Sequence, residues 1–399
     1  MNTRNKILES LSKDLDIPKS AYDEAEQRYD ALTDFIEKHP LLNQYDPHIF
    51  VQGSFALGTA IKPMGNDAAY DIDLGCKLRQ KIDKTTHSQM QLKTIVKDVL
   101  SEYVQSNGFK RDVEEKRRCW TIEYSSTPSF HLDIVPCIPE SEEKRREVAL
   151  SMESYYGESY NDLRDENYQD YSIAITDNND PSNYSTINNE WPQSNPEGYA
   201  KWFKRQSDQV HGRVARATLE ARIDKVPRFA GEKTPLQKTV QILKKHRDEY
   251  YSEKNKNTDL KPISIIISTI AAKSYSGEAT LEEALVKTVQ GLSEFINSGP
   301  KYEVPNPVKP SENFADKWEE KPTLISHFRA WVNQLNQDLS YLAEEEVSME
   351  SISTVFKEGF GLEPDLAALG KECGIGSQQR PVPGVVNTPK ASPWSRACD

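Results

Sequence analysis

Apolar positions recur at helical spacing near the start of the chain and again after its midpoint. Residues 1–39 carry this spacing, which Pro18 interrupts and Pro40 ends. We therefore expect a long N-terminal helix that packs along the body of the protein. A second helix is predicted from about residue 88 to residue 106, because an Asn-Gly pair typical of a helix end follows it.

Three short segments have the pattern of β-strands. Residues 49–51 form an apolar run, while residues 117–124 and 129–136 alternate between apolar and polar positions. Residues 140–195 are polar and rich in Asn, Asp, Tyr and Ser, which predicts loops with one short strand. From Pro196 onward the pattern is helical again.

Two aspartates stand two residues apart within the segment from Val51 to Gly75. Because successive side chains of a strand face opposite ways, Asp71 and Asp73 share one face roughly 7 Å apart. Two carboxylates on one face repel each other unless a cation lies between them. The pair therefore indicates a site for a divalent metal.

Gly53 and Ser54 come at the end of the apolar strand that precedes this pair. A glycine there lets the backbone approach a ligand, and a serine can cap the turn or helix that follows. Backbone N–H groups at such a turn suit a phosphate. Together with the acids, the turn indicates a triphosphate held at one end and a metal at the other.

A third acid, Asp133, lies on the polar face of a predicted strand. If that strand pairs with the strand of Asp71 and Asp73, about 4.8 Å away, three carboxylates converge on one small volume. Such a set suits phosphoryl or nucleotidyl transfer on two metal ions. Each motif alone has a plainer interpretation, as a solvated strand face, a turn, or a partner of Arg117 or Arg118. Their order along the chain favours a functional site.

Composition narrows the range of possible partners, cofactors and cellular locations. The formal charge of −12 argues against general electrostatic binding to nucleic acid, and anionic nucleotides would need metal ions and local Lys or Arg. The five cysteines show no CxxC or Cys/His cluster, so neither zinc nor a disulfide framework is expected. Without a signal-peptide pattern or an apolar run long enough for a bilayer, we expect a cytoplasmic protein with no membrane partner.

The Gly-Ser turn, the sequence DID at 71–73 and the sequence LDI at 132–134 look like the signature of the polymerase-β-like nucleotidyltransferases. Three later runs resemble the bacterial CD-NTases, which are related to cyclic GMP-AMP synthase and oligoadenylate synthase. These runs are Leu236–Asp248, Lys261–Ala272 and Val304–Trp318. The resemblance covers most of residues 45–360 and implies a synthase of cyclic oligonucleotide signals in anti-phage defence (CBASS).

The resemblance implies an α+β fold with two lobes and the active site in the cleft between them. We expect a nucleotidyltransferase core with a mixed sheet and the long N-terminal helix at 1–215, a helical lobe at 216–373, and a flexible tail at 374–399. The gap between Ser54 and Asp71 is longer than the common family pattern, with MGNDAA as an extra turn. The metal-binding thumb of the animal synthase has no counterpart, which argues against activation by DNA.

The resemblance also implies roles for the site residues. Gly53 and Ser54 would hold the donor's β and γ phosphates. Asp71 and Asp73 would bind both Mg²⁺ ions, which Mn²⁺ can replace, and Asp133 would bind the catalytic ion and help to take the proton of the acceptor hydroxyl.

Two further residues are candidates from the family pattern of a lysine on the helix that faces the cleft and a serine that begins the next helix. These candidates are Lys238 and Ser264. Lys244 and Lys245 compete with Lys238, although both also suit a solvated helix face. Tyr184 is a candidate for stacking on a base.

Several alternatives remain open in the sequence. The substrates are nucleoside triphosphates as donor and acceptor, and the product is a cyclic di- or trinucleotide, a linear oligonucleotide or a modified small molecule. An inactive nucleotidyltransferase fold that serves as a scaffold is the alternative from another class. The tail, which ends Arg396-Ala397-Cys398-Asp399, is expected to be a disordered end. The resemblance leaves open a conjugating or regulatory partner that acts at the C-terminus, since relatives can be joined to other molecules there.

Overall fold

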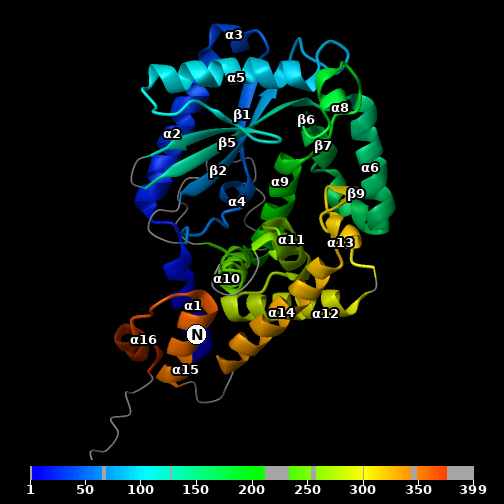
Figure 1. Cartoon of the computed structure of the whole chain (residues 1–399). Helices are drawn as coiled ribbons and strands as arrows, with labels where there is room; N and C mark the ends of the chain where they lie inside the picture. The colour runs from blue at the N-terminus through cyan, green and yellow to red at the C-terminus, as the bar shows by residue number, and fades with distance from the viewer. Residues whose placement is uncertain are drawn as a thin grey trace, which may run out of the picture.

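A mixed seven-stranded β-sheet forms one half of the molecule, in the upper part of Figure 1. The structure, a computed structural model, describes residues 2–64, 69–125, 128–211, 233–252, 258–299, 301–342 and 348–374. The strands of the sheet are β1 (Pro47–Gln52), β2 (Tyr70–Leu78), β3 (Glu114–Glu115), β4 (Trp120–Tyr124), β5 (Phe130–Pro139), β6 (Ile173–Ile175) and β7 (Gln193–Ser194).

Strand β5 is the centre of this sheet. On one side it runs parallel to β2, and on the other it pairs antiparallel with β4 along its first half and with β6 along its last three residues. Strand β1 is the antiparallel neighbour of β2, β3 lies beyond β4, and β7 lies beyond β6. The mixed sheet with its many helices confirms the α+β fold class.

Two long helices, α2 (Lys19–Lys38) and α5 (Gln89–Ser106), share one hydrophobic core with the sheet. The helix predicted from the apolar spacing near residue 88 is confirmed as α5. It begins there because the Ser88 side chain accepts a hydrogen bond from the Gln91 backbone, while the Gln91 side chain accepts one from the Ser88 backbone. We call the sheet with these two helices the sheet half.

The segment predicted as loops with one short strand contains more structure than the sequence indicated. It includes β6, β7 and the helices α6 (Glu142–Tyr156), α7 (Asn161–Arg164) and α8 (Pro181–Ser185). Helix α6 has 15 residues but buries only Val148 and Met152. So narrow an apolar stripe gives no helical periodicity to detect, which is why the prediction of loops was wrong there.

The lower part of Figure 1 is built of helices around a second core, and we call it the helical half. Helix α11 lies inside it and buries seven consecutive residues, as expected of a helix that is apolar all round. The elements of the helical half are α1 (Thr3–Leu15), α9 (Pro196–Ser207), α10 (Pro235–Tyr250), α11 (Ser264–Ser274), α12 (Leu281–Asn297), α13 (Lys317–Glu320), α14 (Thr323–Tyr341), α15 (Met349–Thr354), α16 (Leu366–Cys373) and the hairpin of β8 (Pro305–Asn306) and β9 (Lys309–Asn313).

The expected single N-terminal helix is two helices that belong to different cores. Helix α1 packs in the helical half, next to α15 and α16 in Figure 1, whereas α2 packs against the sheet. Neither Asp16 nor Pro18 has helical geometry, and Pro18 also disfavours it in Ile17, the residue before it. The first segment of the chain therefore crosses from one half to the other.

Some expectations fall outside the described residues. Most of the MGNDAA turn, the boundary at residue 215 and nearly all of the tail lie there. Within the described ranges, no helix is both long and apolar enough to cross a membrane.

Gly75, two residues beyond the acid pair on β2, allows the Phe50 ring of β1 to lie against the strand. A Cβ atom at Gly75 would stand 2.1 Å from this fully buried ring. We predict that Gly75→Ala destabilises the protein by about 1–3 kcal/mol, through overpacking of the core. Urea unfolding measures this loss. Gly359→Ala is the control, because its Cβ would meet neighbours only at an ordinary 3.5 Å.

Candidate active site

The parallel pairing of β2 with β5 brings the three predicted acids to one place on the sheet. Asp73 and Asp133 are direct register partners, and Asp71 is opposite His131. Asp71 reaches toward solvent with 75% of its side chain exposed, whereas only 25% of the Asp133 side chain is exposed. The strands therefore bring the carboxylates together from two segments some sixty residues apart in sequence.

The Gly-Ser turn lies directly against the acid pair. Gly53 begins the short helix α4 (Gly53–Ala56) with a φ of +64°, which favours glycine. A Cβ atom at Gly53 would lie 2.1 Å from Oδ2 of Asp73. Glycine is thus needed for its backbone conformation and also for the approach of the Asp73 carboxylate.

A cavity of about 530 Å³ lies between this face of the sheet half and the helices α10 and α11. Of the seven predicted site residues, six line it, and Lys238 does not. The lining comprises Gly53–Phe55, Leu57, Thr59–Met64, Ala69–Asp71, Asp73, Lys116, Asp133, Lys244, Arg247, Asp248, Lys261, Ser264, Ile265 and Ser268.

Helix α10 holds the segment that follows the Gly-Ser turn. Three side chains on one face of α10 donate to three backbone carbonyls of that segment: Gln237 to Leu57 at 3.0 Å, Gln241 to Ala60 at 2.7 Å and Lys244 to Thr59 at 3.0 Å. Their spacing of four and three residues places them on one face of the helix. These bonds fix the turn relative to the helical half.

Of the three candidate lysines of α10, Lys244 is the one that lines the cavity. Its Nζ is close enough to Asp73 for each charge to affect the other's pKa. The predicted candidate Lys238 instead pairs with Glu9 of α1 at 2.7 Å, because it lies on another face of α10. Lys245 lies 3.7 Å from Glu249 on its own helix. The three lysines differ in the face of α10 on which each side chain lies, and the sequence motif does not show which face points to the cavity.

Ser264 lies at the start of α11, as predicted, and lines the cavity. Its hydroxyl accepts a hydrogen bond of 2.9 Å from Arg247. Arg247 and Lys261 both pair with Asp248 on the cavity wall. Tyr184 of α8 is outside the cavity lining and lies over Lys93.

Sequence reasoning missed Lys116, Thr59, Lys261 and, as a cavity residue, Arg247. His246, the neighbour of Arg247 on α10, makes separate contacts in the helical half: it accepts from the Trp331 indole at 3.0 Å and pairs with Asp338. Lys116 precedes a strand in a run of charged residues. No spacing signal separates it from its neighbours, so only the fold identifies it.

Burial and charge repulsion both raise the pKa values of acids in this cluster. Burial, followed by the charges of Asp133 and Asp71, raises the pKa of Asp73 to about 7. On the opposite wall, burial and the charge of Arg247 lower the pKa of Lys244 to about 8. The site thus holds negative charge that the surrounding residues compensate only in part.

The carboxylates fit a divalent cation by their chemistry, since hard cations prefer oxygen ligands and would offset this charge. Among the described residues, no three His, Cys, Asp or Glu side chains lie close enough together to form a ready-made metal site. Asp133 is turned toward Lys116 and Thr121, and Asp71 toward His131. A cation would therefore require these two carboxylates to turn from their present partners.

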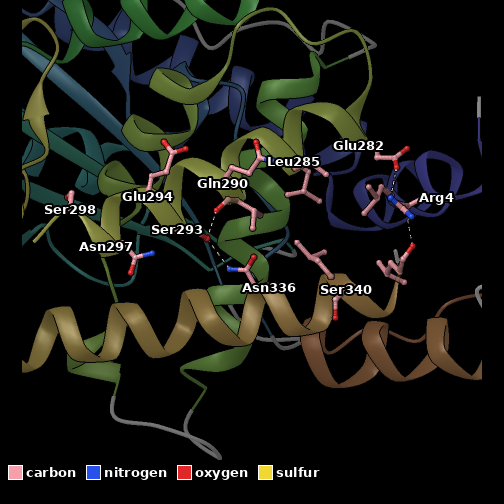
Figure 2. Close-up of a pocket in the computed structure, with 15 residues that line it drawn as sticks. Arg4, Glu282, Leu285, Gln290, Ser293, Glu294, Asn297, Ser298, Asn336 and Ser340 are labelled. Carbon is pink, nitrogen blue, oxygen red and sulfur yellow. Dashed lines mark hydrogen bonds and ion pairs between the residues drawn. The ribbon is translucent and has the colours of Figure 1, made fainter. Parts of the chain in front are cut away.

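A larger cavity of about 670 Å³ lies in the helical half, between α12 and α14 with α1 at one end (Figure 2). An ion pair of 3.0 Å between Arg4 and Glu282 lies at that end, and Asn336 donates to Ser293 on its wall. None of the predicted site residues lines this cavity. The acids, rather than cavity size, identify the candidate active site.

Comparisons with known proteins cover the part of the chain that carries the three acids. Residues 47–136, which include all three acids and the Gly-Ser turn, match the family model described as cyclic GMP-AMP synthase DncV-like, nucleotidyltransferase domain. A c-di-GMP synthase of Roseivirga ehrenbergii is 27% identical over 95% of this chain and 90% of its own length. The cyclic dinucleotide synthase CdnG of Bradyrhizobium diazoefficiens is 22% identical over 89% and 80%.

The structure of the Bradyrhizobium diazoefficiens CD-NTase CdnG in complex with GTP superimposes with a TM-score of 0.64 at 18% identity, covering 92% of this chain and 97% of that one. The match of residues 47–136 and the named relatives identify a nucleotidyltransferase, a class of enzyme that generally uses divalent metal ions. Within this class, the chain is similar to the DncV-like CD-NTases, through the match of residues 47–136 and through both relatives.

The raised pKa of Asp73 predicts how the metal-free protein responds to pH. Between about pH 4 and pH 7 the folded state keeps a proton that the unfolded state has lost, so stability falls as pH rises through this window. In chelator, we expect Asp73→Asn to raise Tm by a few degrees at pH 8 and to change it little at pH 4.5.

Differential scanning calorimetry measures this difference. The same substitution at the exposed Asp98 of α5 is the control and should give equal shifts at both pH values. An equal shift for Asp73→Asn at the two pH values would contradict the electrostatic account of the site.

Proposed function

We propose that this chain joins nucleoside triphosphates through successive phosphodiester bonds, releases pyrophosphate and closes the product into a cyclic di- or trinucleotide. The observation that carries the proposal is the acid set of β2 and β5 facing the Gly-Ser turn across one cavity. The names of the relatives, which are cyclic dinucleotide synthases, support the cyclic product. The family resemblance supports a signal made in anti-phage defence.

The donor triphosphate would lie along the Gly-Ser turn. Gly53 and Ser54 line the cavity where α4 begins, and backbone N–H groups at such a turn suit phosphate oxygens. Lys244, fixed by its bond to Thr59, adds a positive charge from the opposite wall. Arg247 and Lys261 supply further positive charge near Ser264, at the start of α11.

Asp71, Asp73 and Asp133 would hold two Mg²⁺ ions, or Mn²⁺ in their place. When bound, the ions would activate the attacking hydroxyl and stabilise the charge of the leaving pyrophosphate. Asp133 would also help to take the proton of the acceptor hydroxyl. Asp73, which lies between the turn and Asp133, would orient the donor relative to that acceptor.

Ring closure requires the same residues to act twice. The linear intermediate would leave, turn and present its own triphosphate to the Gly-Ser turn, with its free hydroxyl at Asp133. The test is incubation of purified protein with each labelled triphosphate and with all four together, with Mg²⁺ or Mn²⁺. We expect label in a product that resists phosphatase, because a ring has no terminal phosphate. A phosphatase-sensitive product would identify a linear polymerising enzyme.

We predict that Asp71→Ala combined with Asp73→Ala abolishes incorporation of label. Folding should be intact, because the change removes like charges that repel each other. Circular dichroism checks the fold, and Asp98→Ala on the surface of α5 is the matched control. Product formation by the double variant would exclude these acids from the chemistry, and no incorporation by the unaltered protein with either metal would favour the scaffold alternative.

Lys244 and Lys238 give a second matched pair, since both are on α10 but only Lys244 lines the cavity. We predict that Lys244→Met lowers kcat/KM for the triphosphates by about 10–100-fold, the range expected for a charged hydrogen bond. Lys238→Met should stay within about twofold of the unaltered protein. Steady-state kinetics on both variants decides which lysine serves the site, and equal losses would contradict the assignment.

A further inference from the structure

Lys116 is a positively charged group of the cavity to which the proposed chemistry gives no role. It lies in the turn between β3 and β4, which a backbone bond of 3.0 Å from Lys116 to Cys119 closes. Its Nζ is 3.2 Å and 3.4 Å from the two carboxylate oxygens of Asp133. The Thr121 hydroxyl donates to the same carboxylate.

The buried side chain of Lys93 stabilises this turn. Lys93 of α5 is 0% exposed, and its Nζ donates to the carbonyl of Lys116 at 2.5 Å and to that of Arg117 at 3.3 Å. It also pairs with Glu115 at 3.0 Å. A buried ammonium group is stable only with such partners, so the turn and Lys93 fix each other.

Asp177 stabilises the same turn through a second set of hydrogen bonds. Asp177 accepts hydrogen bonds from Arg117 at 2.7 Å and from Arg118 at 2.9 Å. The backbone N–H of Asp177 in turn donates to Gln89 of α5 at 2.8 Å. The contacts of Lys93 and of Asp177 therefore fix the backbone around Lys116. Its side chain is 43% exposed and can move.

We propose that Lys116 is a positioning residue that serves as the internal counter-ion of Asp133. It neutralises and orients this carboxylate until a divalent cation replaces it. The inference rests on the proposed function, in which Asp133 is a metal ligand. Lys116 accordingly competes with the incoming metal: its ammonium group leaves Asp133 and moves toward solvent along the cavity edge.

The competition predicts an effect on metal affinity opposite to that of removing a ligand. Without the ammonium group, a divalent cation no longer displaces or repels a positive charge next to Asp133. We expect Lys116→Met to bind Mn²⁺ about tenfold more tightly than the unaltered protein, the size expected for a partly screened charge at this range. Lys116→Arg keeps the charge and should stay within about twofold.

Calorimetric titration of the nucleotide-free protein with Mn²⁺ measures these affinities without any need for turnover. Lys97→Met is the matched control, because it removes a neighbouring positive charge that lies over Trp120 and not on Asp133. It should bind Mn²⁺ as the unaltered protein does. Unchanged or weaker binding by Lys116→Met overturns the inference.

Asp73→Asn separates this outcome from failure of the proposed function. If the unaltered protein binds Mn²⁺ and Asp73→Asn does not, the metal site is correct, and the Lys116 variants alone decide the role of Lys116. If Asp73→Asn binds Mn²⁺ as well as the unaltered protein does, the metal site itself is wrong, and the counter-ion role falls with it.

Discussion

The parallel pairing of β2 with β5 is the interaction on which the rest of the site depends. It places Asp73 beside Asp133, although the two residues are some sixty positions apart, and it does so through backbone bonds that are independent of the acids. The side chains are therefore held close together against their mutual repulsion. The core beneath the strands, with Ile72, Leu132 and Ile134 fully buried, provides the stabilisation that offsets this repulsion.

The helical half completes the site by fixing the phosphate turn. Gln237, Gln241 and Lys244 bind three carbonyls of one short segment, and Gly58 permits the contact because a Cβ there would lie 2.4 Å from the Gln237 amide. The sheet half supplies the acids, and the helical half sets where the turn lies relative to them. This division explains why the signature acids alone do not define the complete cavity.

Much of this was predictable from periodicity and motif. Helix α5 follows from helical spacing of apolar residues, and the convergence of Asp71, Asp73 and Asp133 from strand alternation and pairing. The α+β class came from the family resemblance. Other features depend on contacts distant in sequence. Lys238 and Lys244 stand in one helical run, and only the packing of α10 against α1 and the turn shows which of them faces the cavity. Helix α6 escaped prediction because it buries two side chains, and the break between α1 and α2 separates two cores that periodicity cannot tell apart.

The placement of α1 has a consequence for how the chain folds during synthesis. Its buried side chains, Ile7, Leu8, Leu11 and Leu15, pack in the core that α10, α12 and α16 complete. From Leu15 to Pro235 the ribosome must add 235 − 15 = 220 residues, which takes roughly 10–45 s at usual rates of synthesis. Throughout that interval α1 carries an apolar face without its partners, while the sheet half can already form. The nascent chain thus exposes its first hydrophobic stripe longest, and this stripe is the segment most available to chaperones.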